Sequence, residues 1–235
     1  MKSVGIVGGL GSKTTARFYL KISDCFRENR KVSPKITIDN CAFPLELEEE
    51  IILKSKNEAK LLPFLKESIA RLNKAGVDLI VIPCNTAHLF IDELRKHSKA
   101  KILSILEEMV KEVKRKNIST VGILATSKIV ESGLYQKILE KEGISYVLPN
   151  KKSRKVLSKC ILEILENKSN QKTRNKIKKV FQHLLKEGAE TVFLACTDLK
   201  LVLGKNIVKH IDSFDILFEA TIKEMEGGKN GTRTT

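Results

Sequence analysis

The chain has 235 residues, of which 42% are hydrophobic and 30% charged, and its net charge is +15. This length is enough for one large domain or two compact domains with buried cores. No apolar run approaches the roughly 18 residues that a membrane span needs, and the first residues lack the apolar core and cleavage site of a signal peptide. We therefore expect a cytoplasmic protein that does not bind a membrane.

The positive charge does not indicate a nucleic-acid partner. Its densest stretches, residues 151–159 and 172–179, lie in helical patterns with apolar residues on the opposite face. Lysines in such patterns usually form a solvated helix face. Aromatic residues make up only 5% of the chain, and no Arg/aromatic platform for stacking bases is visible.

The five cysteines and four histidines form neither a disulfide framework nor a metal site by their spacing. The sequence contains no C-x-x-C and no H-x-x-x-H, so we expect no metal ion. Cys25 and Cys160 lie on the apolar sides of predicted helices and are expected to be buried hydrophobic residues. Cys41 ends a strand-like run, and the sequence indicates no role for it. Cys84 and Cys196 remain as the candidates for chemistry.

Apolar runs typical of buried strands alternate with amphipathic helical patterns along the chain. We predict strands at residues 3–7, 35–39, 78–82, 120–124, 146–148 and 191–195. We predict helices at residues 16–26, 58–74, 105–116, 133–141 and 174–186. This alternation favours an α/β fold whose parallel sheets are covered on both faces. Residues 226–235, which read EGGKNGTRTT, are expected to be disordered.

Two segments of the first half of the chain have counterparts in the second half. VGIVGG at residues 4–9 resembles VGILAT at residues 121–126, and VIPCNTAH at residues 81–88 resembles FLACTDLK at residues 193–200. A chance similarity of hydrophobic strands is the alternative explanation.

We interpret these counterparts as two pseudo-symmetric, doubly wound parallel-sheet domains. The predicted domains are residues 1–100 plus 208–225 and residues 101–207, with the active site in the cleft between them. The segment 211–225 is expected to return and pack on the first half.

Cys84 and Cys196 each follow a predicted strand and precede a helical pattern. Ligands of open parallel sheets bind outside the carboxyl ends of the strands, which is where both thiols are expected. A thiol at a helix N-terminus feels the positive end of the backbone dipole, which favours the thiolate. Two acid–base groups on opposite faces of one carbon suit stereoinversion, so we expect one thiolate to take a proton and the other thiol to deliver one. The alternative is that both cysteines only fill the core.

Backbone N–H groups after the strands are candidates for holding a substrate carboxylate and a developing carbanion. They belong to Asn85, Thr86, Thr126 and Thr197. A glycine-rich turn at Gly9, Leu10 and Gly11 would let the backbone approach the same carboxylate.

Two nucleotide-binding patterns fail at this turn. A phosphate loop requires glycine directly before Lys13, where Ser12 stands, and the dinucleotide fingerprint lacks its third glycine. His88 is interpreted as a residue that makes a local hydrogen bond.

Five motifs resemble the aspartate/glutamate racemase family, and specifically its aspartate racemase branch. They are VGIVGGLG at residues 4–11, VIPCNTAH at 81–88, VGILAT…SGLY at 121–135, ACTDL at 195–199 and IDS at 211–213. The resemblance implies an isomerase, namely a cofactor-independent (PLP-independent) amino-acid racemase that is commonly a homodimer. It also implies that Cys84 and Cys196 are the catalytic acid and base, each serving one enantiomer, and that Asp198 is one of the substrate-binding residues.

The sequence departs from the family pattern where the substrate's side chain would be bound. Aspartate racemases have an arginine in the region of residues 43–48 and a lysine near Glu166, and neither is present here, although Lys168 is close. Asp198 stands where the family usually has glutamate.

We expect aspartate or another acidic amino acid as the substrate. The alternatives are a same-fold enzyme acting on a hydantoin or on maleate, or a catalytically silent amino-acid-binding protein.

Overall fold

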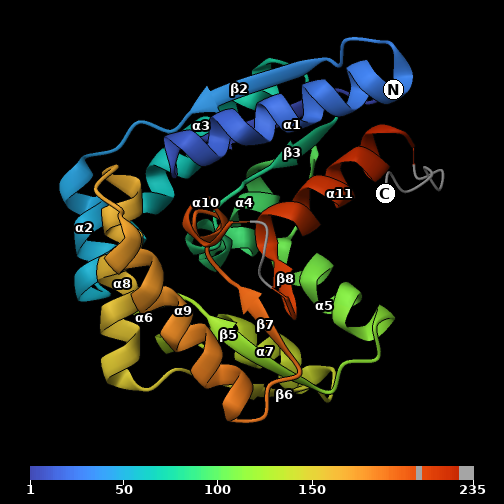
Figure 1. Ribbon diagram of the computed structural model, residues 1–235. Coiled ribbons are helices and arrows are strands. Elements are labelled where there is room, and N and C mark those ends of the chain that lie inside the picture. The colour runs from blue at the N-terminus through green and yellow to red at the C-terminus, as the bar shows by residue number, and fades with distance from the viewer. Residues whose placement is uncertain (205–207, 228–235) are drawn as a thin grey trace.

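Two four-stranded parallel sheets form the framework of the protein in the computed structural model, which describes residues 1–204 and 208–227. The strand order is β2-β1-β3-β4 in the first sheet and β6-β5-β7-β8 in the second. In Figure 1 the first sheet lies in the upper part of the molecule and the second in the lower part. The strands are β1 (Val4–Gly8), β2 (Ile36–Asn40), β3 (Leu79–Val81), β4 (Lys101–Ile102), β5 (Thr120–Leu124), β6 (Ser145–Val147), β7 (Thr191–Leu194) and β8 (His210–Asp212).

Helices connect successive strands and cover both faces of the sheets. The α-helices are α1 (Ser12–Arg30), α2 (Leu45–Lys54), α3 (Leu62–Lys74), α4 (Ile91–His97), α5 (Ile105–Arg115), α6 (Ser127–Glu131), α7 (Leu134–Lys141), α8 (Lys151–Leu165), α9 (Gln171–Lys186), α10 (Leu199–Leu203) and α11 (Ser213–Met225). Two 3₁₀ helices are η1 (Glu58–Leu61) and η2 (Thr86–Phe90). The predicted α/β fold with two doubly wound parallel sheets is confirmed.

The two sheets have equivalent topology. β1 and β5 occupy the same place in their sheets, and so do β3 and β7. These are the strands that carry the paired sequence segments, so the internal similarity reflects two structurally equivalent halves.

Strand pairing differs from the predicted domain limits at both edges. β4 pairs with β3 in the first sheet, whereas β8 pairs with β7 in the second. These strands have only two and three residues, which is too short for an apolar pattern to reveal them. The predicted limit at residue 207 and residues 228–235 of the predicted tail lie outside the described residues. The division into domains stays a prediction.

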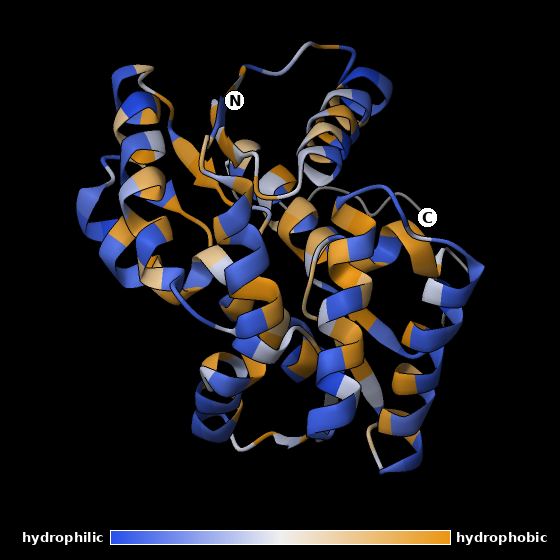
Figure 2. Cartoon of the chain, turned by 90° about the vertical axis from the view of Figure 1, so that its left-hand side faces the viewer, coloured by the Kyte–Doolittle hydropathy of each residue, from blue (hydrophilic) through white to orange (hydrophobic). Residues whose placement is uncertain are grey.

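One hydrophobic cluster is shared by the two halves. It contains Val4 and Ile6 of β1 together with Val121 of β5 and Phe193 of β7, all completely buried. Two further clusters cover the outer faces of the sheets, under α2, α3 and α4 on one side and under α8, α9 and α10 on the other. Figure 2 shows the hydrophobic residues of the helices turned inward and the hydrophilic ones outward.

Two helices cross from one half to the other. α2 packs against α8 and α6 of the second half, and its Ile52 belongs to the cluster of α8 and α9. α11 follows β8 of the second sheet but contacts α1 and β3 of the first half as well as α5. Within the described residues, no helix is long and apolar enough to cross a membrane.

Candidate active site

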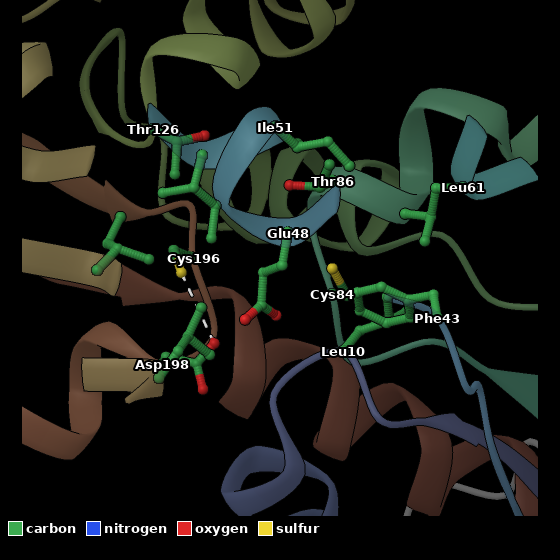
Figure 3. A pocket seen from close by; sticks show the side chains of 13 residues that line it. Leu10, Phe43, Glu48, Ile51, Leu61, Cys84, Thr86, Thr126, Cys196 and Asp198 are labelled. Atoms are coloured by element: carbon green, nitrogen blue, oxygen red, sulfur yellow. Dashed lines mark hydrogen bonds between the residues drawn. The ribbon is translucent and has the colours of Figure 1, made fainter. Parts of the chain in front are cut away.

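A pocket of about 490 Å³, part of it open to solvent, lies between the two halves. Side chains from both halves line it, and Figure 3 shows them. They are Leu10, Phe43, Glu48, Ile51, Ile52, Leu61, Cys84, Thr86, Thr126, Ile161, Leu165, Cys196 and Asp198.

Cys84 lies at the carboxyl end of β3 and directly before the turn that leads into η2. Its position is fixed through His88, whose Nδ1–H donates to the Cys84 carbonyl at 2.8 Å. The Nε2 atom of His88 accepts the backbone N–H of Ile105 at 3.0 Å. Both ring nitrogens are therefore used in the neutral tautomer, and burial lowers the pKa of His88 to about 4. The local hydrogen bond predicted for His88 is present, and His88 is a positioning residue.

Cys196 occupies the equivalent place after β7. Its Sγ lies 3.8 Å from Asp198 Oδ2, and Thr14 Oγ1 donates to Asp198 Oδ1 at 2.6 Å. Asp198 is almost completely buried, and burial raises the pKa of its carboxyl group. Although aspartate is shorter than glutamate, it reaches both the thiol and α1 from this position.

Burial dominates the ionisation of both thiols. It raises the pKa of Cys84 to about 12 and raises the pKa of Cys196 well above its usual range. Backbone hydrogen bonds from Thr86 and Ala87 lower the pKa of Cys84, but by less than burial raises it. Burial therefore outweighs the expected effect of the helix N-terminus, which was to favour the thiolate. The helices that follow the thiols, η2 and α10, have only five residues each, so their dipoles are weak.

Four of the predicted binding residues line the pocket, namely Leu10, Thr86, Thr126 and Asp198. Thr126 is the N-cap of α6, where its Oγ1 accepts the backbone N–H of Ile129 at 3.4 Å. Its hydroxyl proton therefore stays available to a ligand.

The two glycines of the turn after β1 are needed for close packing rather than as a lining of the pocket. Gly9 has a φ of 84°, and a Cβ there would lie 2.7 Å from the carbonyl oxygen of Cys41. Gly11 has a φ of 97°, and a Cβ there would lie 2.9 Å from Asp198 Oδ1. Gly11 thus leaves the space in which Asp198 approaches α1.

Asn85 and Thr197, which directly follow the two cysteines in the sequence, join the halves. The Asn85 amide donates to Ser213 Oγ at 3.0 Å and accepts the hydroxyl of Tyr135. Thr197 Oγ1 donates to the carbonyl of Pro83 at 2.9 Å. Their side chains do not line the pocket, and a substrate-binding role for them and for the two glycines stays a prediction.

Seven lining residues were not predicted from the sequence. They are Phe43, Glu48, Ile51, Ile52, Leu61, Ile161 and Leu165. Most belong to α2 or α8, which pack against each other. The signal that could have found Glu48 is its position in the segment where the family resemblance implied an arginine.

The electrostatics at Glu48 are unusual for a glutamate. Burial raises its pKa to about 7, and the carboxylates of Asp198, Glu166 and Glu49 add to this effect. In the described part of the chain no hydrogen bond or ion pair reaches the Glu48 carboxylate. Across the same described residues, no cluster of three or more His, Cys, Asp or Glu side chains could hold a metal ion.

The chain belongs to the Asp/Glu/hydantoin racemase family, whose model matches residues 7–221. The broad specificity amino-acid racemase RacX of Bacillus subtilis is 27% identical over 226 residues, which cover 93% of this chain and 96% of RacX. The structure of Picrophilus torridus aspartate racemase superposes with a TM-score of 0.79 at 25% identity, covering 96% of this chain and 95% of that one. The structure of an aspartate racemase homologue from Pyrococcus horikoshii superposes with a TM-score of 0.76 at 26% identity, covering 96% of this chain and 100% of that one. The family predicted from the motifs is confirmed, and with it the isomerase class.

Proposed function

We propose that this protein is an amino-acid racemase in which Cys84 and Cys196 are the two acid–base groups. The observation that carries the proposal is that both thiols line one pocket from equivalent positions in the two halves. The other cysteines do not line it: Cys41 and Cys160 are buried elsewhere, and Cys25 is half-buried on α1. The family membership and the similarity to amino-acid racemases support the same conclusion.

In the proposed reaction, one cysteine as thiolate removes the proton from the substrate's α-carbon. The electron pair of the broken C–H bond is held as a carbanion conjugated with the carboxylate. The opposite cysteine, as thiol, then delivers its proton to the other face of the carbon. Each turnover therefore exchanges the protonation states of the two sulfurs, and no cofactor takes part in the proposal.

Proton transfer by side chains alone accelerates a reaction by about 10²- to 10⁴-fold, so the site must also stabilise the carbanion. The hydroxyls of Thr86 and Thr126, one from each half, lie in the pocket with the thiols. We assign them to the substrate carboxylate, together with the backbone N–H groups that follow β3 and β7. The apolar lining excludes water and strengthens these interactions.

Incubation with single L-amino acids in deuterated water tests the proposal. We expect incorporation of deuterium at the α-carbon, followed by NMR, and formation of the D-enantiomer, followed by chiral chromatography. Cys84→Ala and Cys196→Ala should each lower formation of the D-enantiomer by at least about 10²-fold. Cys25→Ala is the matched control and should retain activity, because this thiol does not line the pocket.

Unchanged racemisation in either active-site variant would contradict the two-thiol mechanism. If the wild-type protein exchanged no amino acid, the result would favour a catalytically silent amino-acid-binding protein. Exchange of a hydantoin, or isomerisation of maleate, in place of amino-acid exchange would favour the same-fold alternatives.

The proposal extends to the state and location of the protein. By analogy with the family we propose a cytoplasmic homodimer that acts on a small amino acid and binds neither nucleic acid nor membrane. Light scattering during size-exclusion chromatography measures the oligomeric state.

A further inference from the structure

We infer that the substrate's side chain carries a positive charge, as in lysine, ornithine or arginine, and that Glu48 binds this charge. The inference rests on the proposed racemase function and names the substrate class of that site. It departs from the sequence-based expectation of an acidic amino acid.

The charged groups of the pocket wall all have the same sign. Among the lining residues that the structure describes, the ionisable carboxyl groups are those of Glu48 and Asp198, and lysine, arginine and histidine are absent. A substrate with a negatively charged side chain would meet carboxylates here and no cation.

The two carboxyl groups differ in how they are engaged. Asp198 is occupied by Thr14 and by the thiol of Cys196. Glu48 has no such partner in the described chain, and its carboxyl group points into the pocket between Cys84 and Cys196 (Figure 3). It is therefore the group available to a ligand.

Of the three nearby cations, the two lysines are already paired with glutamates. Lys128 of α6 forms an ion pair with Glu58, and Lys168 pairs with Glu166 at 2.9 Å while its side chain is 71% exposed. The charge of Arg17 lowers the pKa of Asp198, and its guanidinium lies 5.0 Å from the centre of the Phe214 ring, where its buried Nη1 has no hydrogen-bond partner among the described residues. None of these three side chains lines the pocket.

Burial is the main reason that the pKa of Glu48 is raised, neighbouring carboxylates raise it further, and no cation is among the groups that shift it. A cation brought in by the substrate would supply the missing partner and favour the ionised carboxylate. A charge-assisted hydrogen bond formed in such a partly buried place is stronger than a neutral one.

The apolar part of the pocket suits the stem of a long basic side chain. Ile51, Ile52 and Leu61 line it from the first half, and Ile161 and Leu165 from the second. Lysine and arginine place their methylene groups along such surfaces while their charged end remains paired.

The test compares kcat/KM for L-lysine, L-norleucine and L-aspartate. Norleucine has the same chain as lysine without the ammonium group, so the ratio of the two isolates the charge. We expect wild-type protein to prefer lysine over norleucine by at least about tenfold, and to use aspartate least of the three. Glu48→Gln should lower kcat/KM for lysine by about 10- to 100-fold while that for norleucine changes by less than about threefold.

Glu46→Gln is the matched control, because Glu46 is exposed on the same helix and does not line the pocket. It should leave the preference for lysine unchanged. The wild-type comparison needs no variant, so a misfolded Glu48→Gln protein would not remove the test.

The possible outcomes separate this inference from the proposed function. Thiol-dependent racemisation of aspartate or norleucine in preference to lysine would overturn the inference and leave the racemase proposal intact. A preference for lysine that survives in Glu48→Gln would also overturn it. Absence of exchange with every amino acid would overturn both.

Discussion

At the residue scale, the two thiols lie in surroundings that oppose their ionisation. Burial is the main cause for both, and the backbone hydrogen bonds reduce its effect without cancelling it. In the proposed reaction one of them must nevertheless be a thiolate before it can remove a proton.

This requirement predicts a pH dependence. Because the pKa of Cys84 is raised to about 12, the thiolate fraction below that pH should rise about tenfold per pH unit. We expect kcat/KM, which reports on the free enzyme, to rise with pH at nearly this slope between about pH 7 and about pH 8.5. Racemisation followed by chiral chromatography measures it, with circular dichroism at each pH as the control for folding. A flat profile would show that a thiolate is already present in the resting enzyme.

Gly11 gives a second prediction at this scale. In Gly11→Ala the new Cβ would lie 2.9 Å from Asp198 Oδ1 and the backbone would keep a φ of 97°. We expect the free energy of unfolding to fall by about 1–2 kcal/mol, because alanine is strained in this backbone conformation. We also expect a large loss of activity, because the new Cβ displaces Asp198 from Cys196. Thermal unfolding and racemisation rates measure the two effects.

Gly76→Ala is the control for this variant. Gly76 also has a positive φ, of 66°, but a Cβ there meets nothing within 4 Å. Gly76→Ala should lose a similar amount of stability, because alanine is strained at a positive φ, and should remain active. Equal activity of the two variants would contradict the role given to Gly11.

The sequence predicted some site residues and missed others for a physical reason. Cys84 and Cys196 each follow a strand in a similar motif, and strand ends meet at one edge of a sheet, so sequence alone could pair them. Glu48 lines the pocket only because α2 packs on α8 of the other half. That contact cannot be predicted from the residues around Glu48 in the sequence. The ionisation state of the thiols was missed because burial is a property of the whole fold.

At the element scale, α2 is the helix that closes the pocket from the first half onto the second. Its Ile52 is 7% exposed and packs in the cluster formed by α8 and α9, while the next residue, Leu53, is 41% exposed. One side of α2 therefore packs on the second half of the chain, and the opposite side faces solvent.

Ile52→Ala should therefore cost about 2–4 kcal/mol of stability and also lower activity, because the mutation removes apolar contact between α2 and the second half. Leu53→Ala, on the exposed side, should change stability by no more than about 0.5 kcal/mol. Urea unfolding measures both values. Equal effects of the two substitutions would show that α2 does not depend on this contact.

The elements that sequence patterns located well are the long ones. β1 and β5 have five residues each and bury almost all of them, so their apolar runs are clear. β4 and β8 are held mainly by pairing with the neighbouring strand, and their two or three residues carry no pattern of their own. The sheet that each of these two strands joins is decided by its pairing with the neighbouring strand in the folded protein.

At the scale of the whole molecule, the halves are joined where the chemistry is expected. They share a hydrophobic cluster, and Thr197 and Asn85 tie them by buried hydrogen bonds next to the two cysteines. The equivalence of the halves could be inferred from repeated motifs, because both copies retain the strand that precedes the thiol. Their mutual arrangement could not, because it depends on packing between segments far apart in the sequence.

The equivalence of the halves is incomplete at the thiols themselves. Cys196 has the Asp198 carboxyl group 3.8 Å away, whereas Cys84 is held through the His88 contact to its backbone. If the two sulfurs take the proton from opposite enantiomers, each direction of the reaction starts from a different form of the enzyme. In one form Cys84 is the thiolate, and in the other Cys196 is.

Mirror-image amino acids have the same free energy in water, so the equilibrium constant between them is one. Detailed balance then forces kcat/KM to be equal in both directions, however different the sulfurs are. The imperfect symmetry of the protein can appear only as a matched difference in kcat and KM, with the enantiomer that binds more tightly turning over more slowly in the same proportion.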